Sequence, residues 1–311
     1  MPNSIRRLAG ALIYDAPRFE QHVRGRWQLI RNRNERITVD ESGRGVRCEW
    51  QWTSTVHYCD VFPSQAERLM RTSFGEWPIL RRDTPAVPGS PVVSFIIGHR
   101  GSERLPLLLE TIESIAGQDV PVEVVVVEQS VSLSDLPGWV AHIPMTIASD
   151  AEPYNRSAAF NEGVRHARAS LLVLHDGDIL VPKSYAREIV RQAESGYAAI
   201  DLKRFLFYLG SSGRCEKVLQ NAHGGSVAIT SEGFDAIGGF DERFVGWGGE
   251  DNDFWDRAET LESTRFGYLP LLHLWHGPQG EKQRSPAVDR YYNQLALLPV
   301  RERIARLRGE S

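Results

Sequence analysis

The sequence predicts an α/β fold built on a mostly parallel sheet with helices on both faces. Three short apolar segments, at residues 92–97, 122–127 and 171–174, have the composition of buried strands. Between them, residues 105–116 and 157–169 show the helical spacing of apolar residues. This alternation of strands and helices is typical of parallel sheets whose connecting helices cover both faces.

A proline-rich segment at residues 85–91 separates this α/β part from the residues before it. Residues 26–60 show short alternating runs around turns, which predict strands, and a helix is predicted at 64–73. We therefore expect a small N-terminal α+β accessory module at residues 1–88, the α/β domain at 89–280 and a helical tail at 281–311. The module could be a structural brace, or its tryptophan-rich strands could bind a ligand. The tail is expected to end in one Arg-rich helix that holds Leu295, Leu297, Leu298, Ile304 and Leu307.

The composition excludes several classes of protein. The chain has 311 residues and a net charge of -4, so it lacks the basic surplus that binding to nucleic acid requires. Its three cysteines are unclustered, which argues against a disulfide framework and a cysteine metal site. No apolar run approaches the ~20 residues of a membrane span, and the N-terminal residues lack the features of a secretory signal. We expect a cytoplasmic location; the arginines near both ends leave peripheral membrane contact open.

An acidic turn follows the third predicted strand. Asp176-Gly177-Asp178 stands where ligands bind in parallel sheets, beyond the carboxyl end of a strand. Two carboxylates at this spacing suit Mg²⁺ or Mn²⁺, which can bridge a diphosphate, although an ordinary Asp-Gly turn has the same sequence. Two histidines, His273 and His276, lie in an apolar segment where each could be a core residue. One of them is a candidate third ligand, and an imidazole favours Mn²⁺ over Mg²⁺.

The most informative segment is residues 246–253, which combine an aromatic residue, paired glycines and three acids. A helix is expected to begin at the acids, because apolar residues recur with helical spacing after them. The acids could simply complement the helix dipole, at ~0.3–1 kcal/mol each. An aromatic face beside carboxylates is also what a sugar site requires, and glycines let the backbone approach a ligand. The residues concerned are Trp247, Gly248, Gly249, Glu250, Asp251 and Asp253.

Three segments in this order, 154–163, 223–230 and 246–253, resemble the GT-A-fold inverting glycosyltransferases. The similarity is to the β-1,4-galactosyltransferase group and its bacterial relatives, and it covers about residues 91–280. The Trp-Gly-Gly-Glu-Asp motif is specific to this group, whereas an isolated Asp-x-Asp is not. The resemblance implies metal-dependent, inverting transfer of Gal, GalNAc, Glc or GlcNAc from a UDP-sugar to a hydroxyl. The acceptor would be a glycan, a peptide or a small natural product.

The resemblance also implies roles for individual residues. Asp251 corresponds to the general base. The sugar and acceptor pocket is expected to involve Trp247, Glu250, Gly225 and Gly249. The nucleotide part of the donor is expected to contact His99, Arg100, Glu128, Tyr154, Arg156 and Asp176. The metal, Mn²⁺ or Mg²⁺, is expected to bind Asp178, Asp176 and His276, with His273 the less favoured histidine.

Two features depart from the family pattern. Gly98-His99-Arg100 replaces the commoner Pro-x-Arg or Pro-Thr-Tyr after the first strand, and Asn252 stands where relatives often have Asp. Two other functions stay as alternatives. One is a metal-dependent phosphohydrolase that uses His175 with the acidic turn, although such sites normally have histidines on helices. The other is a catalytically silent module that binds a sugar or a nucleotide.

Overall fold

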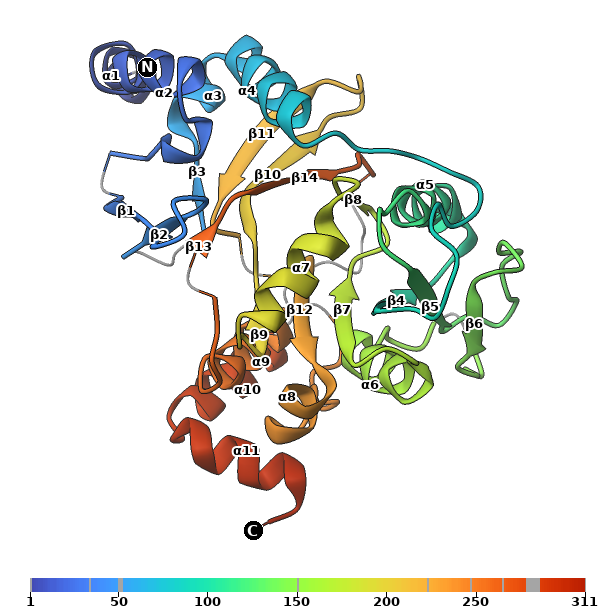
Figure 1. The fold of residues 1–311 in the computed structure, drawn as a ribbon. Coiled ribbons are helices and arrows are strands. Elements are labelled where there is room, and N and C mark those ends of the chain that lie inside the picture. Colours follow the sequence, from blue (N-terminus) through green and yellow to red (C-terminus); the bar gives the residue numbers. More distant parts are fainter. Residues whose placement is uncertain are drawn as a thin grey trace.

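The computed structural model describes residues 2–33, 35–49, 53–149, 151–222, 224–246, 248–264, 266–277 and 286–310, with no account of the side chains of residues 2, 3 and 286. Within these ranges, the largest sheet has six strands in the order β6-β5-β4-β7-β12-β9 (Figure 1). Strand β4 (Val93–His99) is parallel to β5 (Val122–Glu128) and β7 (Leu171–His175), and β5 is parallel to β6 (Ala141–Pro144). Strand β12 (Ser226–Thr230) is antiparallel to both β7 and β9 (Ala199–Ile200).

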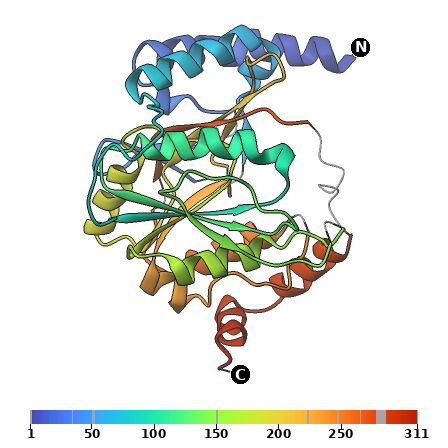
Figure 2. The same ribbon diagram turned by 90° about the vertical axis from the view of Figure 1, so that its right-hand side faces the viewer.

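Helices cover both faces of this sheet (Figure 2). Alternate residues of β4 point to opposite faces: Phe95 and Ile97 pack in one apolar core with α5 (Leu105–Ala116) and α7 (Tyr185–Glu194). Ile96 packs in a second core with α6 (Arg156–His166), α8 (Ser231–Ala236) and α9 (Glu250–Ala258). The prediction of a mostly parallel α/β sheet covered on both faces is confirmed. A 3₁₀ turn, η3 (Ser102–Arg104), precedes α5.

A second sheet lies beside the first and was not expected from the sequence. Its order is β3 (Ser54–Thr55), β11 (Cys215–Gln220), β10 (Lys203–Leu209), β14 (Leu269–His273) and β8 (Ile179–Leu180). Strand β8 directly follows the acidic turn, and it pairs with β14 so that Ile179 is opposite His273. This pairing brings the histidine segment beside the acidic turn, about a hundred residues earlier in the chain.

The N-terminal residues form α1 (Pro2–Gly10), a π-helical turn η1 (Ala11–Asp15), α2 (Ala16–Arg24) and a 3₁₀ turn η2 (Trp27–Leu29). Strands β1 (Ile37–Val39) and β2 (Val46–Cys48) follow, then α3 (His57–Val61) and α4 (Pro63–Glu76), which matches the helix predicted at 64–73. The helices at residues 2–24 were not expected. Strand β2 pairs with β1 and with β13 (Phe266–Gly267) in a third, three-stranded sheet. Strand β3 pairs with β11 in the second sheet, so this segment shares these two sheets with later parts of the chain. The domain boundary at residue 88 stays a prediction.

In its described part, residues 286–310, the C-terminal tail has two helices in place of the single one expected, α10 (Pro286–Ala296) and α11 (Val300–Arg308). Pro299 caps α11, and a residue before a proline is disfavoured in helical conformation, so the helix cannot continue through this point. Leu297, expected within the helix, lies instead in the connection between the two and is 84% exposed. Over the described ranges, no helix is both long enough and apolar enough to cross a membrane.

Candidate functional site

The acidic turn is held in place by a buried histidine. His175, the last residue of β7, bonds through Nδ1 to Ser226 Oγ (2.8 Å) and through Nε2 to the Ile179 carbonyl (2.9 Å). Burial lowers the pKa of His175 to about 4, so its ring is neutral at neutral pH. Both ring nitrogens are engaged, which leaves none for a metal. The phosphohydrolase alternative, which needs His175 as a ligand, therefore has no support in this geometry.

Asp178, His273 and His276 form a cluster whose potential ligand atoms lie within 4.8 Å of one another. The Nε2 atoms of His273 and His276 lie 3.7 and 3.6 Å from the two carboxylate oxygens of Asp178. Asp178 is buried, and its Oδ1 has no hydrogen-bond partner. The ring of His273 also stacks on Tyr208, with 4.3 Å between centroids, which fixes its orientation.

The contacts of the Nδ1 atoms show where His273 and His276 carry a proton. Nδ1 of His273 lies 2.7 Å from the Leu274 carbonyl, and Nδ1 of His276 lies 2.8 Å from the Gly277 carbonyl. A carbonyl only accepts, so each Nδ1 carries a proton, and a neutral ring then presents an Nε2 lone pair to Asp178. Lone pairs and a carboxylate facing one another are the donor set of a divalent cation. Two imidazoles suit Mn²⁺ or another transition metal better than Mg²⁺.

The cluster differs in membership from the set inferred from the sequence. Asp178 and His276 are present, and His273, the less favoured histidine, is present as well. Asp176 is not part of it, because its carboxylate pairs with Arg156. The cause is β14, whose pairing with β8 places both histidines beside the turn.

Arg156, the first residue of α6, connects the acidic turn to the acidic motif. Its Nε and Nη2 donate to Asp176 Oδ1 at 3.0 and 2.7 Å, and its Nη1 donates to Asp251 Oδ1 at 2.7 Å. Glu250 Oε1 lies 3.5 Å from the same Nη1. Burial alone lowers the pKa of Arg156, but the three carboxylates outweigh it and hold the pKa well above its usual range. One permanent cation therefore organises carboxylates from two distant segments.

Glu250 and Asp251 are adjacent but lie in different environments. Glu250 is 7% exposed, and its Oε2 is buried without a hydrogen-bond partner. Burial, reinforced by the charge of Asp251, raises the pKa of Glu250 to about 7. Asp251 is more open and pairs directly with Arg156. Near neutral pH, Glu250 can therefore hold a proton and donate a hydrogen bond, whereas Asp251 accepts one from Arg156.

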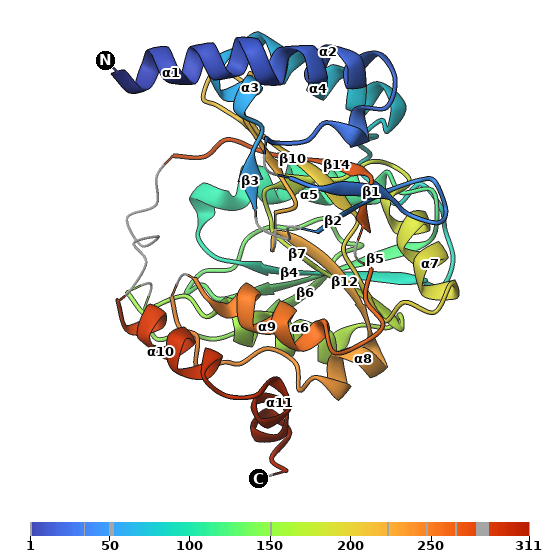
Figure 3. The same cartoon turned by 90° about the vertical axis from the view of Figure 1, so that its left-hand side faces the viewer.

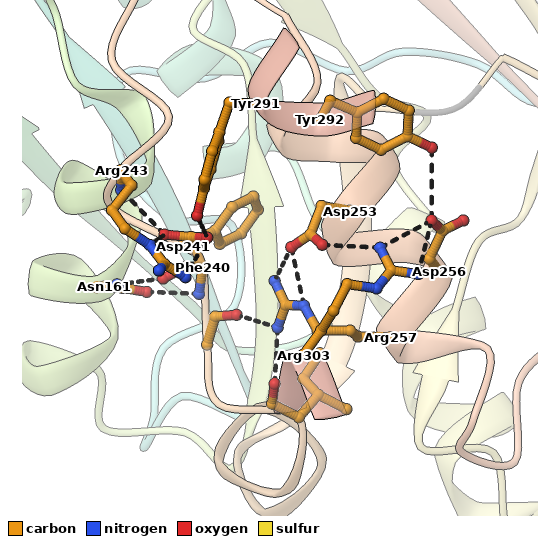
Figure 4. Close-up of polar contacts among 12 residues, drawn as sticks. Asn161, Phe240, Asp241, Arg243, Asp253, Asp256, Arg257, Tyr291, Tyr292 and Arg303 are labelled. Atoms are coloured by element: carbon orange, nitrogen blue, oxygen red, sulfur yellow. Dashed lines mark hydrogen bonds and ion pairs between the residues drawn. The ribbon is translucent and has the colours of Figure 1, made fainter. Parts of the chain in front are cut away.

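The third acid of the motif has a structural role (Figure 4). Asp253 accepts from Arg257 Nε and from Arg303 Nη1, both at 2.9 Å, and all three side chains are buried. Nearby, the Tyr291 hydroxyl of α10 donates to Asp241 at 2.6 Å. The Arg303 contact fastens α9, and with it Glu250 and Asp251, to α11, and the Tyr291 contact fastens α10 to the segment that precedes α9. The sequence did not assign this supporting role to the tail.

Three glycines near the acids lie too close to neighbouring side chains to carry a Cβ. Gly224 has φ +77°, and a Cβ there would lie 2.3 Å from Asp251 Oδ2. At Gly225, with φ +74°, a Cβ would meet the Ile179 side chain at 2.7 Å. Gly249 precedes α9 with φ +86°, and a Cβ there would lie 2.9 Å from the Phe244 ring. A side chain at any of these positions would disturb the site.

The remaining candidates lie at the ends of β4 and β5. The Tyr154 hydroxyl lies against Gly98, where a Cβ would be only 2.2 Å away, and burial raises the pKa of Tyr154, which keeps it protonated. Arg100 is half-buried just beyond β4. Glu128 is buried and accepts from the Ser134 backbone and hydroxyl and from His142 Nε2 (2.7 Å).

The same group of side chains includes His99, whose Nε2 lies 3.4 Å from Ser134 Oγ. Burial raises the pKa of Glu128, but its hydrogen bonds outweigh this and lower the pKa overall. Burial also lowers the pKa of His99, against the opposing charge of Glu128. Ser134 and His142 belong to this network although no sequence motif marks them. Trp247, expected in the sugar pocket, lies outside the described residues, as does His223.

Comparison with known proteins identifies relatives of part of the chain. Residues 211–268 match the family described as the N-terminal domain of galactosyltransferase. Human β-1,4-galactosyltransferase 5 is 31% identical over 113 residues, which are 35% of this chain and 27% of the relative. The match therefore spans about a quarter of the length of this curated relative. The resemblance to the β-1,4-galactosyltransferase group, predicted from the motifs, is confirmed for this part of the chain.

Among solved structures, the catalytic domain of Drosophila β-1,4-galactosyltransferase 7, in complex with xylobiose, is similar with a TM-score of 0.41 and 18% identity. The similarity covers 65% of this chain and 79% of that one. S. aureus TarS 1–349, in complex with UDP-GlcNAc, has a TM-score of 0.48 and 15% identity, and covers 70% of each chain. The family match and the observed sheet with helices on both faces agree with the predicted GT-A fold class.

Proposed function

We propose that this chain is a metal-dependent, inverting glycosyltransferase that moves a sugar from a UDP-sugar to an acceptor hydroxyl. One observation carries the proposal: Arg156 joins Asp176, at the end of a parallel strand, to Asp251 and Glu250 of the acidic motif. Asp176 is expected to contact the sugar donor, and Asp251 and Glu250 are expected to contact the acceptor. These carboxylates therefore lie in one site. The family match, which includes the acidic motif, supports the same function.

Asp178, His273 and His276 would hold the divalent cation, Mn²⁺ or Mg²⁺. The bound cation would supply Lewis-acid stabilisation of the negative charge on the UDP leaving group. On the protein side, Tyr154 can donate a hydrogen bond to the diphosphate because it remains protonated. Arg100, His99 and Glu128, at the ends of β4 and β5, would orient the nucleoside.

Asp251 would act as the general base. Arg156 binds its Oδ1, and its Oδ2 lies on the side of Gly224, where only a glycine fits. In a single displacement, the acceptor oxygen forms a bond to the anomeric carbon as the bond to the diphosphate breaks. The proton passes to Asp251, and the bonding electrons leave with UDP.

Glu250 has a different part in this mechanism. With a pKa near 7 and a buried, unpartnered Oε2, it can exchange a hydrogen bond with a sugar hydroxyl. Gly225 and Gly249, where a Cβ would meet Ile179 and Phe244, are proposed to contact the sugar through their backbone. Trp247 is proposed to orient the acceptor. The donor sugar would be Gal, GalNAc, Glc or GlcNAc, and the acceptor a glycan, a peptide or a small natural product.

The test is calorimetric titration of nucleotide diphosphates with Mn²⁺, with Mg²⁺ and with EDTA, followed by assays of UDP release from the four UDP-sugars. We expect metal-dependent binding of UDP and slow hydrolysis of at least one UDP-sugar. Binding without any turnover, with or without acceptors, would favour the alternative of a catalytically silent module. Absence of metal-dependent nucleotide binding would contradict the proposal. A cytoplasmic location also stays a prediction, which fractionation of cells can test.

A further inference from the structure

The helical segment formed by α1, η1 and α2 has one face fixed to the protein. Phe19 is buried and packs against Tyr58, with 4.9 Å between ring centroids. Asp15 forms an ion pair with Arg33 at 2.8 Å. A Cβ at Gly10 would strike the same Arg33 guanidinium, so the helix contacts the protein closely at this point. The segment runs along one end of the molecule, and α1 extends to its edge (Figure 3).

The other face of this segment is apolar and open to solvent. Ile5, Leu8 and Leu12 are 70%, 43% and 51% exposed. Their spacing of three and four residues places them on one side of the helix. Ile13 and Tyr14, 66% and 60% exposed, continue the apolar surface into the π-helical turn. We call these five residues the outer stripe.

The N-terminal segment that carries the outer stripe has a surplus of positive charge. Residues 1–33 contain seven arginines and two acidic residues, in a chain whose net charge is -4. Seven positive and two negative side chains give residues 1–33 a net side-chain charge of +5, with His22 taken as neutral. Asp15 pairs with Arg33, and Glu20 pairs with Arg68 and Arg24. Arg7, on the same helix as the stripe, pairs with Asp60. Arg6, within the stripe's own helix, is exposed.

We propose that the outer stripe docks on an anionic lipid surface, with α1 lying in the plane of the bilayer interface. An interfacial helix has an apolar face that enters the acyl boundary and basic residues that meet acidic headgroups, and tyrosine is enriched at this depth. Pairing with a second copy would be disfavoured, because a symmetric contact sets the same positive surfaces against each other.

The basic helix at the C-terminal end, α11, does not carry an apolar stripe of this kind. It lies at the opposite end of the molecule from α1 (Figure 1), so a flat surface cannot contact both ends. Its Arg303 is buried in the ion pair with Asp253, and Leu297 beside it is a single exposed apolar residue. Of the two arginine-rich ends, the structure assigns membrane contact to the N-terminal one.

The test is co-sedimentation of the full chain with vesicles of phosphatidylcholine alone and of phosphatidylcholine mixed with phosphatidylglycerol. We expect binding to the anionic vesicles that weakens as salt is added. Leu8→Glu should lower the partition coefficient at least about tenfold, because a charge replaces an inserted apolar side chain. Arg6→Gln should lower it about fivefold. The matched controls at the other end, Leu297→Glu and Arg301→Gln, should bind as the parent does.

Several outcomes would overturn the inference. Failure of the parent protein to bind anionic vesicles is one, and unchanged binding of Leu8→Glu is another. Equal binding to neutral and anionic vesicles would contradict the inference that the arginines contact acidic headgroups. Sedimentation of the protein without lipid tests whether the stripe binds a second copy of the chain instead. A dimer that Leu8→Glu dissociates would show this. Because Leu8 is exposed, its variant should keep the parent's melting temperature, and that measurement separates lost binding from lost folding.

Discussion

Replacing Arg156 tests whether one guanidinium organises the proposed site. Arg156 donates hydrogen bonds at 2.7–3.0 Å to Asp176 and Asp251, which come from different segments. Arg156→Lys keeps the positive charge, but an ammonium cannot reproduce the planar fork that spans two carboxylates. Arg156→Gln removes the charge as well. The two variants therefore separate geometry from electrostatics.

The magnitude follows from the contacts that each variant loses. A charge-assisted hydrogen bond contributes about 1.5–3 kcal/mol. The side chains of Asp176 and Asp251 are 36% and 31% exposed, so solvent screens part of this contribution. For Arg156→Lys we therefore expect a loss of transition-state stabilisation at the lower end of this energy range. It corresponds to a decrease of about tenfold to thirtyfold in kcat/KM.

Arg156→Gln should have a larger effect and a different pH profile. A carboxylate that loses a neighbouring cation binds its proton more tightly, so the pKa of Glu250 rises further above its ordinary value. Glu250 then keeps its proton to higher pH, and the acidic limb of the kcat profile moves to higher pH. UDP release measured across neutral pH gives this profile. Unchanged kcat and an unchanged acidic limb in Arg156→Gln would refute the role assigned to Arg156.

A control on the same helix makes the Arg156 result interpretable. Arg165 lies on α6, is 64% exposed and pairs with Glu162 at the surface. Arg165→Gln should leave kcat and the pH profile as in the parent. Melting temperatures of all three variants show whether any loss of activity reflects unfolding.

Three further predictions follow from the same geometry. Asp251→Asn should lower kcat by about 10²–10⁴-fold while calorimetric UDP affinity stays near the parent value, because only the proton acceptor is lost. His273→Ala and His276→Ala should each weaken Mn²⁺ binding at least about tenfold by direct titration, since each removes one ligand. In the parent, the pKa of Glu250 is about 7 in the folded state and ordinarily 4.5, so the protein's free energy of unfolding should fall by up to about 3 kcal/mol as pH rises between these values. Glu250→Gln should remove this pH dependence.

Each of these predictions has a contrary outcome. Near-parent turnover in Asp251→Asn would mean that another group accepts the proton. His166→Ala is the surface control. If either histidine variant binds Mn²⁺ as tightly as this control, that histidine is not a ligand. Parallel curves of melting temperature against pH for the parent and Glu250→Gln would show that Glu250 does not hold a proton at neutral pH.

Local sequence patterns determined three strands of the six-stranded sheet, β4, β5 and β7, and the helices α5 and α6 beside them. The helix predicted at 105–116 has these bounds in the structure, because its apolar spacing and Pro106 near its start are local signals. Helix α9 begins at Glu250 as expected, where Gly249 turns the chain with a positive φ. The α/β class and the acidic groups at strand ends follow from such signals, because helices and buried strands leave short-range patterns in composition.

The tertiary structure alone decided which of these groups meet. Strand β14 pairs with β8, and this pairing places His273 as well as His276 beside Asp178. Arg156 and Asp251 are 95 residues apart in the chain, and no spacing in the sequence predicts their hydrogen bond. The helices at residues 2–24 and the buried contacts of Arg303 with Asp253 likewise depend on partners elsewhere in the chain. Their formation is set by long-range packing and by the pairing of buried charges, which depend on three-dimensional neighbours and leave no local pattern.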